Sequence, residues 1–274
     1  MAWPAACALL HASFAKPRRN SCTVVVLVAQ LSLDLEPSQR AMPIPILMYH
    51  QIAEPFEHGS PFAYLTVDPR NFLRQMTWLK RTGWTGLSMR DLFPYLRGDR
   101  SGKVVGITFD DGFRNVYRNA LPILDRFGFT ATSYIVSRQI GGFNEWDAAL
   151  RVPYSACMSR DEICEWIRHG HEIGAHTLDH ARLTTVAPAE ARRQIADGRH
   201  ELQDLFGCAV DAFCYPYGAL SPRVRDMVAE AGYATATTTH RGRVRSQDDV
   251  LRLPRRLLRN TDGWASVLRK CLTG

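Results

Sequence analysis

Short apolar runs alternate with helix-like segments along most of this chain of 274 residues. The runs are rich in residues that favour strands, and they cover residues 44–49, 104–109, 131–136, 172–175, 212–215 and 233–239. Capped or amphipathic segments between them predict helices. These predicted helices cover residues 69–82, 88–96, 116–127, 159–169, 188–206, 221–231 and 264–271. Such alternation predicts an α/β fold with a parallel sheet, open or closed into a barrel, whose chemistry gathers where the strands end.

The apolar run 104–109 ends in two adjacent carboxylates, Asp110 and Asp111, followed by Gly112. Two like charges at the end of a buried strand require a metal ion, a cationic partner or a shared proton at raised pKa. Asp and Gly are also ordinary turn residues, so a solvated turn remains an alternative for this stretch alone.

Two histidines, His176 and His180, follow the short apolar run 172–175 at positions i and i+4, which is a metal-ligand spacing. Together with Asp111 they offer one carboxylate and two imidazoles to a Zn²⁺-like ion, with positions left open for water and substrate. The histidine pair alone could also be a polar helix start. Asp110, beside this set, could act as general base towards a water made more acidic by the ion.

The turn 215–218 contains Tyr217, whose backbone N–H could face a developing oxyanion, although an ordinary turn residue is an equal alternative. A water nucleophile, a metal ion and an N–H donor together predict hydrolysis of an amide or an ester. We interpret His50 at a strand end as structural. Trp146, in an irregular stretch, is a candidate for stacking on a sugar ring.

The formal net charge is +7, and arginines contribute much of the excess in the last third of the chain. We call these residues the basic tract: Arg241, Arg243, Arg245, Arg252, Arg255, Arg256 and Arg259. The tract could face an acidic polymer such as nucleic acid or an anionic polysaccharide, or it could be a solvated surface. No zinc-finger or aromatic-interleaved pattern accompanies it, so we expect no nucleic-acid partner.

Seven cysteines, an odd number without a CxxC pair, do not form a disulfide framework and favour a reducing compartment. We therefore expect a cytoplasmic protein, with export to the periplasm or the exterior as the alternative. Residues 1–41 differ from the rest and contain an apolar run, 23–29, that is too short to span a bilayer. We expect an extension or a start codon assigned too early, no integral membrane segment, and a folded domain over residues 42–274 with its core at about 102–274.

Three motifs, Thr108–Gly112, His176–His180 and Tyr215–Gly218, resemble in order and spacing the polysaccharide deacetylases. This carbohydrate esterase family, which carries the NodB-homology domain, includes chitooligosaccharide, chitin and peptidoglycan deacetylases. The likeness covers residues 42–274, and the opening Pro45–His50 is similar to the branch of poly-N-acetylglucosamine deacetylases. The resemblance implies a single-domain distorted (β/α)7 barrel and metal-dependent removal of acetyl groups from a glycan.

Carried over by motif, the resemblance assigns Asp110 as general base and Tyr217 as the oxyanion donor. It assigns the metal ligands as Asp111, His176 and His180, with Zn²⁺ expected and Co²⁺ or another divalent ion as alternatives.

The chain departs from the family pattern at two positions. Many members have an arginine that steadies the base where this chain has Cys214, and we hypothesise that Arg255 supplies the guanidinium instead. The motif that holds the family's general acid is not evident, and His240 is the nearest candidate.

We therefore expect a metal-dependent hydrolase that removes N-acetyl groups from an N-acetylhexosamine-containing poly- or oligosaccharide. In this reaction metal-bound water attacks the acetamide carbonyl. The alternatives are an O-acetyl esterase acting on an acetylated glycan and a catalytically weak glycan-binding protein.

Overall fold

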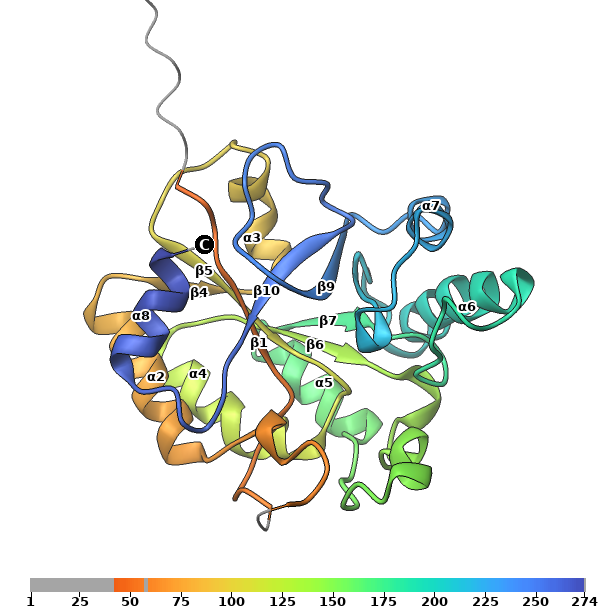
Figure 1. The fold of residues 1–274 in the computed structure, drawn as a ribbon, viewed down its shortest axis with the longest axis horizontal. Coiled ribbons are helices and arrows are strands. Elements are labelled where there is room, and N and C mark those ends of the chain that lie inside the picture. Colours follow the sequence, from red (N-terminus) through yellow and green to blue (C-terminus); the bar gives the residue numbers. More distant parts are fainter. Residues whose placement is uncertain (1–41, 57–58, 274) are drawn as a thin grey trace, which may run out of the picture. The chain divides into compact units, whose positions relative to one another are not determined.

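Seven parallel strands close into a barrel in the computed structural model, which describes residues 42–56 and 59–273. Around the ring they are β1 (Ile46–Tyr49), β10 (Leu253–Leu257), β9 (Thr235–Arg241), β8 (Ala212–Cys214), β7 (Glu172–Ala175), β6 (Thr132–Ile135) and β5 (Val104–Phe109). Because β1 pairs with both β10 and β5, the ring has no free edge. Figure 1 shows the strands crossing at the centre with helices around them. The predicted distorted (β/α)7 barrel is confirmed, whereas the expectation for residues 1–41 lies outside the described residues.

The distortion is located at β5, which divides one of its edges between two neighbours. Its first half pairs with the short strand β4 (Thr85–Leu87), and its second half pairs with β6. A separate two-stranded sheet joins β2 (Gln51–Ile52) to β3 (Thr66–Val67) near the end of β1. The sequence did not predict β2, β3, β4 or β10, which are short or rich in polar residues.

The helices lie where the capped or amphipathic segments predict them. They are α2 (Pro69–Arg81), α3 (Met89–Leu96), α4 (Leu121–Phe127), α5 (Arg160–Arg168), α6 (Pro188–Phe206), α7 (Pro222–Glu230) and α8 (Trp264–Leu272). Asp68 caps α2 by accepting a hydrogen bond from the backbone N–H of Arg70, and Ser159 and Glu162 form the predicted capping box of α5. The predicted helix 116–127 begins with a wider π-helical turn, Val116–Ala120, ahead of α4.

Aromatic packing holds the carboxyl end of β5 in place. Phe109, the residue before Asp110, stacks on Tyr49 at 5.5 Å between ring centroids and meets the edges of Phe72 and Trp166 at 5.8 and 6.1 Å. All four rings are fully buried. Large buried rings contribute strongly to core stability, so the strand end that carries the two carboxylates is a rigid platform. Among the described helices, none combines the length and apolarity needed to cross a bilayer.

Candidate active site and metal centre

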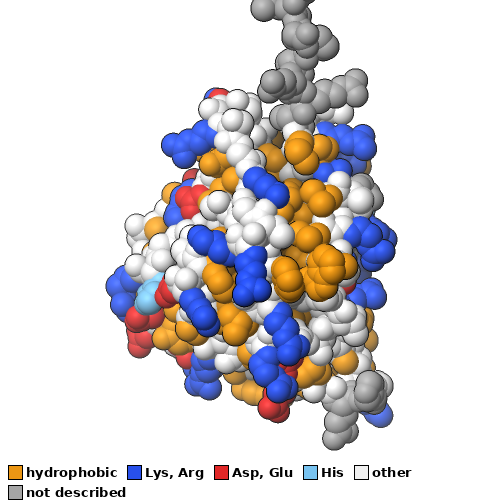
Figure 2. All heavy atoms as spheres, turned by 90° about the vertical axis from the view of Figure 1, so that its left-hand side faces the viewer, with side chains coloured by type: hydrophobic (Ala, Val, Ile, Leu, Met, Phe, Trp, Pro, Cys, Tyr) orange, Lys and Arg blue, Asp and Glu red, His pale blue; other side chains and the backbone are white. Residues whose placement is uncertain are grey.

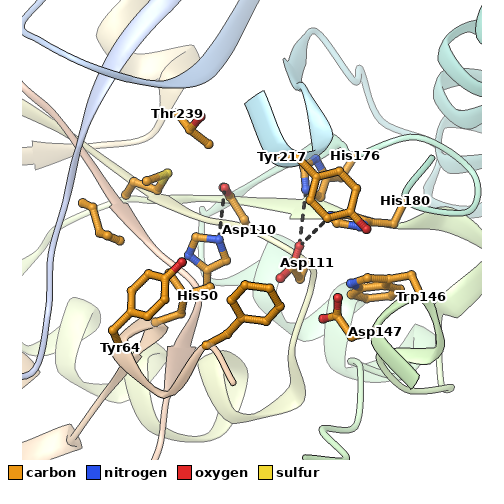
Figure 3. A pocket seen from close by; sticks show the side chains of 14 residues that line it. His50, Tyr64, Asp110, Asp111, Trp146, Asp147, His176, His180, Tyr217 and Thr239 are labelled. Carbon is orange, nitrogen blue, oxygen red and sulfur yellow. Dashed lines mark ion pairs between the residues drawn. The ribbon is translucent and has the colours of Figure 1, made fainter. Parts of the chain in front are cut away.

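The carboxyl ends of the barrel strands meet at one cavity of about 360 Å³. Asp110 and Asp111 follow β5, His50 follows β1, and His176 follows β7. The turn after β8 adds Tyr217. In Figure 3 the two carboxylates lie between His50 on one side and the pair His176 and His180 on the other. The two carboxylates, the histidine pair, Tyr217 and His50 therefore share one rim.

Asp111, His176 and His180 converge as the metal prediction requires. The Nε2 atoms of both histidines lie 3.3 Å from Oδ1 of Asp111, and the three possible ligand atoms lie within 4.8 Å of one another. All three side chains are buried. Burial raises the pKa of Asp111, but hydrogen bonds from His176 and His180 outweigh it and hold this pKa well below its usual range. The carboxylate is therefore ionised and available as a ligand.

The two histidines are oriented by different means. His176 donates its Nδ1–H to the carbonyl oxygen of Cys214 at 2.8 Å, which fixes the ring with Nε2 turned towards Oδ1 of Asp111. His180 has no hydrogen-bond partner at Nδ1 among the described residues. Instead its ring packs between Trp146 and Tyr217, at centroid distances of 4.7 and 4.6 Å. One carboxylate oxygen and two directed imidazole nitrogens form a donor set that suits Zn²⁺.

The second carboxylate, Asp110, pairs with the guanidinium of Arg255. Nη1 and Nη2 of Arg255 donate to Oδ1 and Oδ2 of Asp110 at 2.6 and 2.7 Å, while Nε donates to the carbonyl oxygen of Thr238 at 2.9 Å. Burial raises the pKa of Asp110, but Arg255 outweighs it, and the net pKa lies below the usual range. Nη2 of Arg255 also lies 3.1 Å from Sγ of Cys214. The structure thus brings Arg255 to the place that the sequence hypothesis requires.

His240 does not reach the cavity, contrary to its expected role as general acid. It lies in β9 directly after Thr239, which lines the cavity, and successive residues of a strand point to opposite faces. Its side chain is exposed. His50, interpreted from the sequence as structural, lines the cavity instead, with Nε2 3.7 Å from Oδ2 of Asp110.

Sequence reasoning also missed Asp147, which follows Trp146 in the short helix Glu145–Leu150 and lines the cavity. Burial and the negative charge of Asp111 raise the pKa of Asp147 to about 6. Tyr64, in the segment between β2 and β3, lines the opposite wall (Figure 3). The only sequence feature that pointed to this part of the cavity wall was the aromatic character of the stretch around Trp146.

Backbone strain is concentrated at this site. Asp111, Thr177, His180 and Tyr217 have φ values of 74°, 67°, 58° and 59°, and they make up four of the six described non-glycine residues with positive φ. Each such residue costs about 1–3 kcal/mol and persists only where its surroundings hold it. The strain supports a functional role for the turns that carry the predicted ligands and Tyr217.

Comparison with known proteins gives one family match. The family model described as "Polysaccharide deacetylase" matches residues 97–236. That range contains Asp110, Asp111, His176, His180 and Tyr217, whereas His50 and Arg255 lie outside it.

Individual relatives and a solved structure are similar to this chain. A Bacillus subtilis protein named as a polysaccharide deacetylase, YxkH, is 28% identical over 207 residues, which are 75% of this chain and 67% of that protein. The poly-beta-1,6-N-acetyl-D-glucosamine N-deacetylase of Staphylococcus epidermidis is 24% identical over 75% of this chain and 72% of its own length. The Streptococcus pyogenes deacetylase PplD, solved in complex with acetate, has the same fold, with a TM-score of 0.75, 24% identity, and coverage of 85% of this chain and all of that one.

Proposed function

This chain belongs to the polysaccharide deacetylase family, and we propose that it hydrolyses the N-acetyl amide of a hexosamine unit in a glycan. The observation that carries the proposal is the juxtaposition, in one cavity, of the Asp111–His176–His180 cluster and a second carboxylate, Asp110, held by Arg255. The activity named for the staphylococcal relative supports the choice of an N-acetyl over an O-acetyl group.

In this proposal Asp111, His176 and His180 hold a divalent cation, for which Zn²⁺ is the best match to the donors and Co²⁺ is an alternative. When bound, the cation would polarise the acetyl carbonyl and make a water molecule more acidic. The orientation of His176 by Cys214 and the packing of His180 against Trp146 and Tyr217 prepare the site for such an ion.

Asp110 takes the proton of the attacking water. Its low pKa keeps it ionised, and the bidentate contact with Arg255 fixes its orientation. The water oxygen bonds to the acetyl carbon, and the backbone N–H of Tyr217 serves as a donor to the oxygen that gains negative charge.

His50 supplies the proton that the leaving nitrogen needs. It reaches the cavity beside Asp110 and on the side of the carboxylates opposite to His176 and His180 (Figure 3). The C–N bond breaks, the sugar nitrogen takes the proton from His50, and the products are acetate and a free amine. In this assignment His50 replaces His240 as the general acid.

The test measures acetate release from N-acetylglucosamine oligomers by chelated protein and by protein with Zn²⁺ or Co²⁺ restored. The Asp110→Asn variant is assayed in the same way. We expect metal-dependent release, matched by an equal amount of new free amine and abolished in the variant. Acetate released only from O-acetylated glycans, without new amine, would identify an esterase. Glycan binding without acetate release at metal saturation would identify a binding protein.

A further inference from the structure

A second cavity, of about 320 Å³, borders the catalytic one, and Thr239 and Leu257 line both. It lies between the ends of β9 and β10, the segment 259–262 and α8. Its wall is dominated by cationic side chains: Arg241, Arg256, Arg259, Arg269 and Lys270. Arg255 also borders it, but that guanidinium is paired with Asp110.

Negative charge in this cavity falls far short of the positive charge. Asp262 is the one acidic side chain among the described residues that line it, and it is already paired with Lys270. It also accepts a hydrogen bond from the backbone N–H of Arg259 at 2.7 Å. Within the described part of the chain, Arg241 and Arg269 have no carboxylate at ion-pair distance. The cavity is therefore a concentrated site of uncompensated positive charge.

Arg256 is the strongest sign that an anion belongs in this cavity. Its side chain is only 2% exposed, and its Nη2 donates to the carbonyl oxygen of Thr273. Its Nε and Nη1 have no partner in residues 42–56 and 59–273. Burial and repulsion from Arg241 and Arg243 lower the pKa of Arg256. Two unpartnered nitrogens on a buried guanidinium are destabilising, and a bound carboxylate or phosphate would remove that cost.

We propose that this cavity, which we call the cationic subsite, binds an anionic substituent of the glycan, a carboxylate or a phosphate, close to the acetylated sugar. The proposal rests on the proposed function, because the shared wall formed by Thr239 and Leu257 lets a polymer in the catalytic cavity extend into the subsite. The planar guanidinium suits both anions. The face on the side of α8 agrees: Figure 2 shows Lys and Arg side chains across it and few acidic ones. Part of the basic tract thereby gains a function in substrate choice.

The probes are three versions of one N-acetylglucosamine hexamer: neutral, with part of its C6 hydroxyls oxidised to carboxylates, and with C6 phosphates. Affinities are measured by calorimetry with chelated wild-type protein, in which metal-dependent turnover is stopped and the pair of Arg255 with Asp110 stays intact. We expect at least one anionic hexamer to bind about tenfold more tightly than the neutral one, a preference that weakens as salt rises. The two anionic probes show whether the carboxylate or the phosphate is preferred.

Substitutions identify the residues that cause the preference for the anionic hexamer. In chelated protein, Arg256→Gln and the double variant Arg241→Gln/Arg269→Gln should reduce the preference for the anionic hexamer about tenfold. Arg252→Gln removes an exposed arginine of the basic tract outside the subsite, and should keep the preference. The double variant changes only exposed side chains, so it tests the subsite even if Arg256→Gln fails to fold.

Equal affinities for neutral and anionic hexamers, or a preference that survives in the double variant, would overturn the cationic subsite. Absence of acetate release by the wild-type protein from every hexamer would instead reject the proposed function, because the calorimetric comparison does not use that activity.

Discussion

Arg255 and Asp110, 145 residues apart in the sequence, form a bidentate ion pair inside the barrel. The guanidinium arrives from β10 and the carboxylate from the end of β5, and β1 lies between these two strands in the ring. Because both side chains are at most 3% exposed, the pair is shielded from solvent. Arg255, from the far end of the chain, is therefore the main group that keeps the carboxyl of Asp110 ionised.

Replacement of Arg255 by Met should impair both catalysis and stability. Burial of Asp110 would then be opposed only by the weaker effects of His50 and His176, so the pKa of Asp110 should rise and the acidic limb of the pH profile of kcat/KM should move to higher pH. We expect kcat/KM to fall about 10²- to 10⁴-fold, the range of general-base catalysis, and the free energy of unfolding to fall by about 3–5 kcal/mol. Arg252→Met is the exposed control. Unchanged activity of Arg255→Met would remove Arg255 from the mechanism.

His50→Gln and His240→Gln distinguish the two candidates for the general acid. We expect His50→Gln to lower kcat about 10²- to 10⁴-fold without loss of bound Zn²⁺, because His50 faces the cavity but is not one of the converging ligands. His240 is exposed and outside the cavity, so its variant should keep nearly full activity. Steady-state rates and metal content measured on both proteins decide between them. A larger loss of kcat in His240→Gln than in His50→Gln would identify His240 as the general acid.

Trp146→Ala should weaken metal binding although Trp146 is not a ligand. The indole packs on His180, whose Nδ1 has no hydrogen-bond partner in the described chain. We expect Zn²⁺ affinity, measured by competition with a chromophoric chelator, to fall about 10- to 100-fold, as for other residues that orient a ligand. Trp264→Ala removes an exposed indole that does not line the cavity and serves as the control. Equal Zn²⁺ affinities of Trp146→Ala and wild-type protein would mean that the contact with the indole does not orient His180.

The carboxyl group of Asp147 should report metal binding through its pKa. In metal-free protein burial and the charge of Asp111 raise this pKa to about 6. A cation held by Asp111 cancels part of that charge, so the pKa of Asp147 should fall when Zn²⁺ is added. Carboxyl-carbon NMR titration, with Asp147→Asn for assignment, measures the shift. A pKa that stays near 6 with the metal bound would contradict this account.

The raised pKa of Asp147 also predicts how the stability of the metal-free protein depends on pH. Because the folded pKa of Asp147 lies above the unfolded value, this group contributes stability that is present below about pH 4 and is lost as pH rises through about 6. The comparison is denaturant unfolding of chelated wild type and Asp147→Asn at pH 4 and pH 7. The variant should be relatively more stable at pH 7, and a pH-independent difference would exclude the proposed linkage.

The strands with apolar runs and the metal cluster could be predicted because their signals are local. The run 172–175 and the i, i+4 histidines that follow it are visible in a few consecutive residues. β10 was missed because a proline and two arginines interrupt it, which is unusual for a barrel strand. Arg255 is compensated by Asp110, a partner remote in the sequence. The choice of His50 over His240 depends on the pairing of β1 with β5, which no local pattern encodes.

The closure of the ring by β1 also has a consequence for biosynthesis. Leu47 in the first strand pairs with Arg256 in the last, so the ring cannot close until almost all of the described chain has left the ribosome. Asp111, His176 and His180 are all synthesised well before β10. A nascent chain would therefore hold all three proposed metal ligands before Arg255 exists to pair with Asp110, and completion of the last strand would convert a metal-binding intermediate into an enzyme.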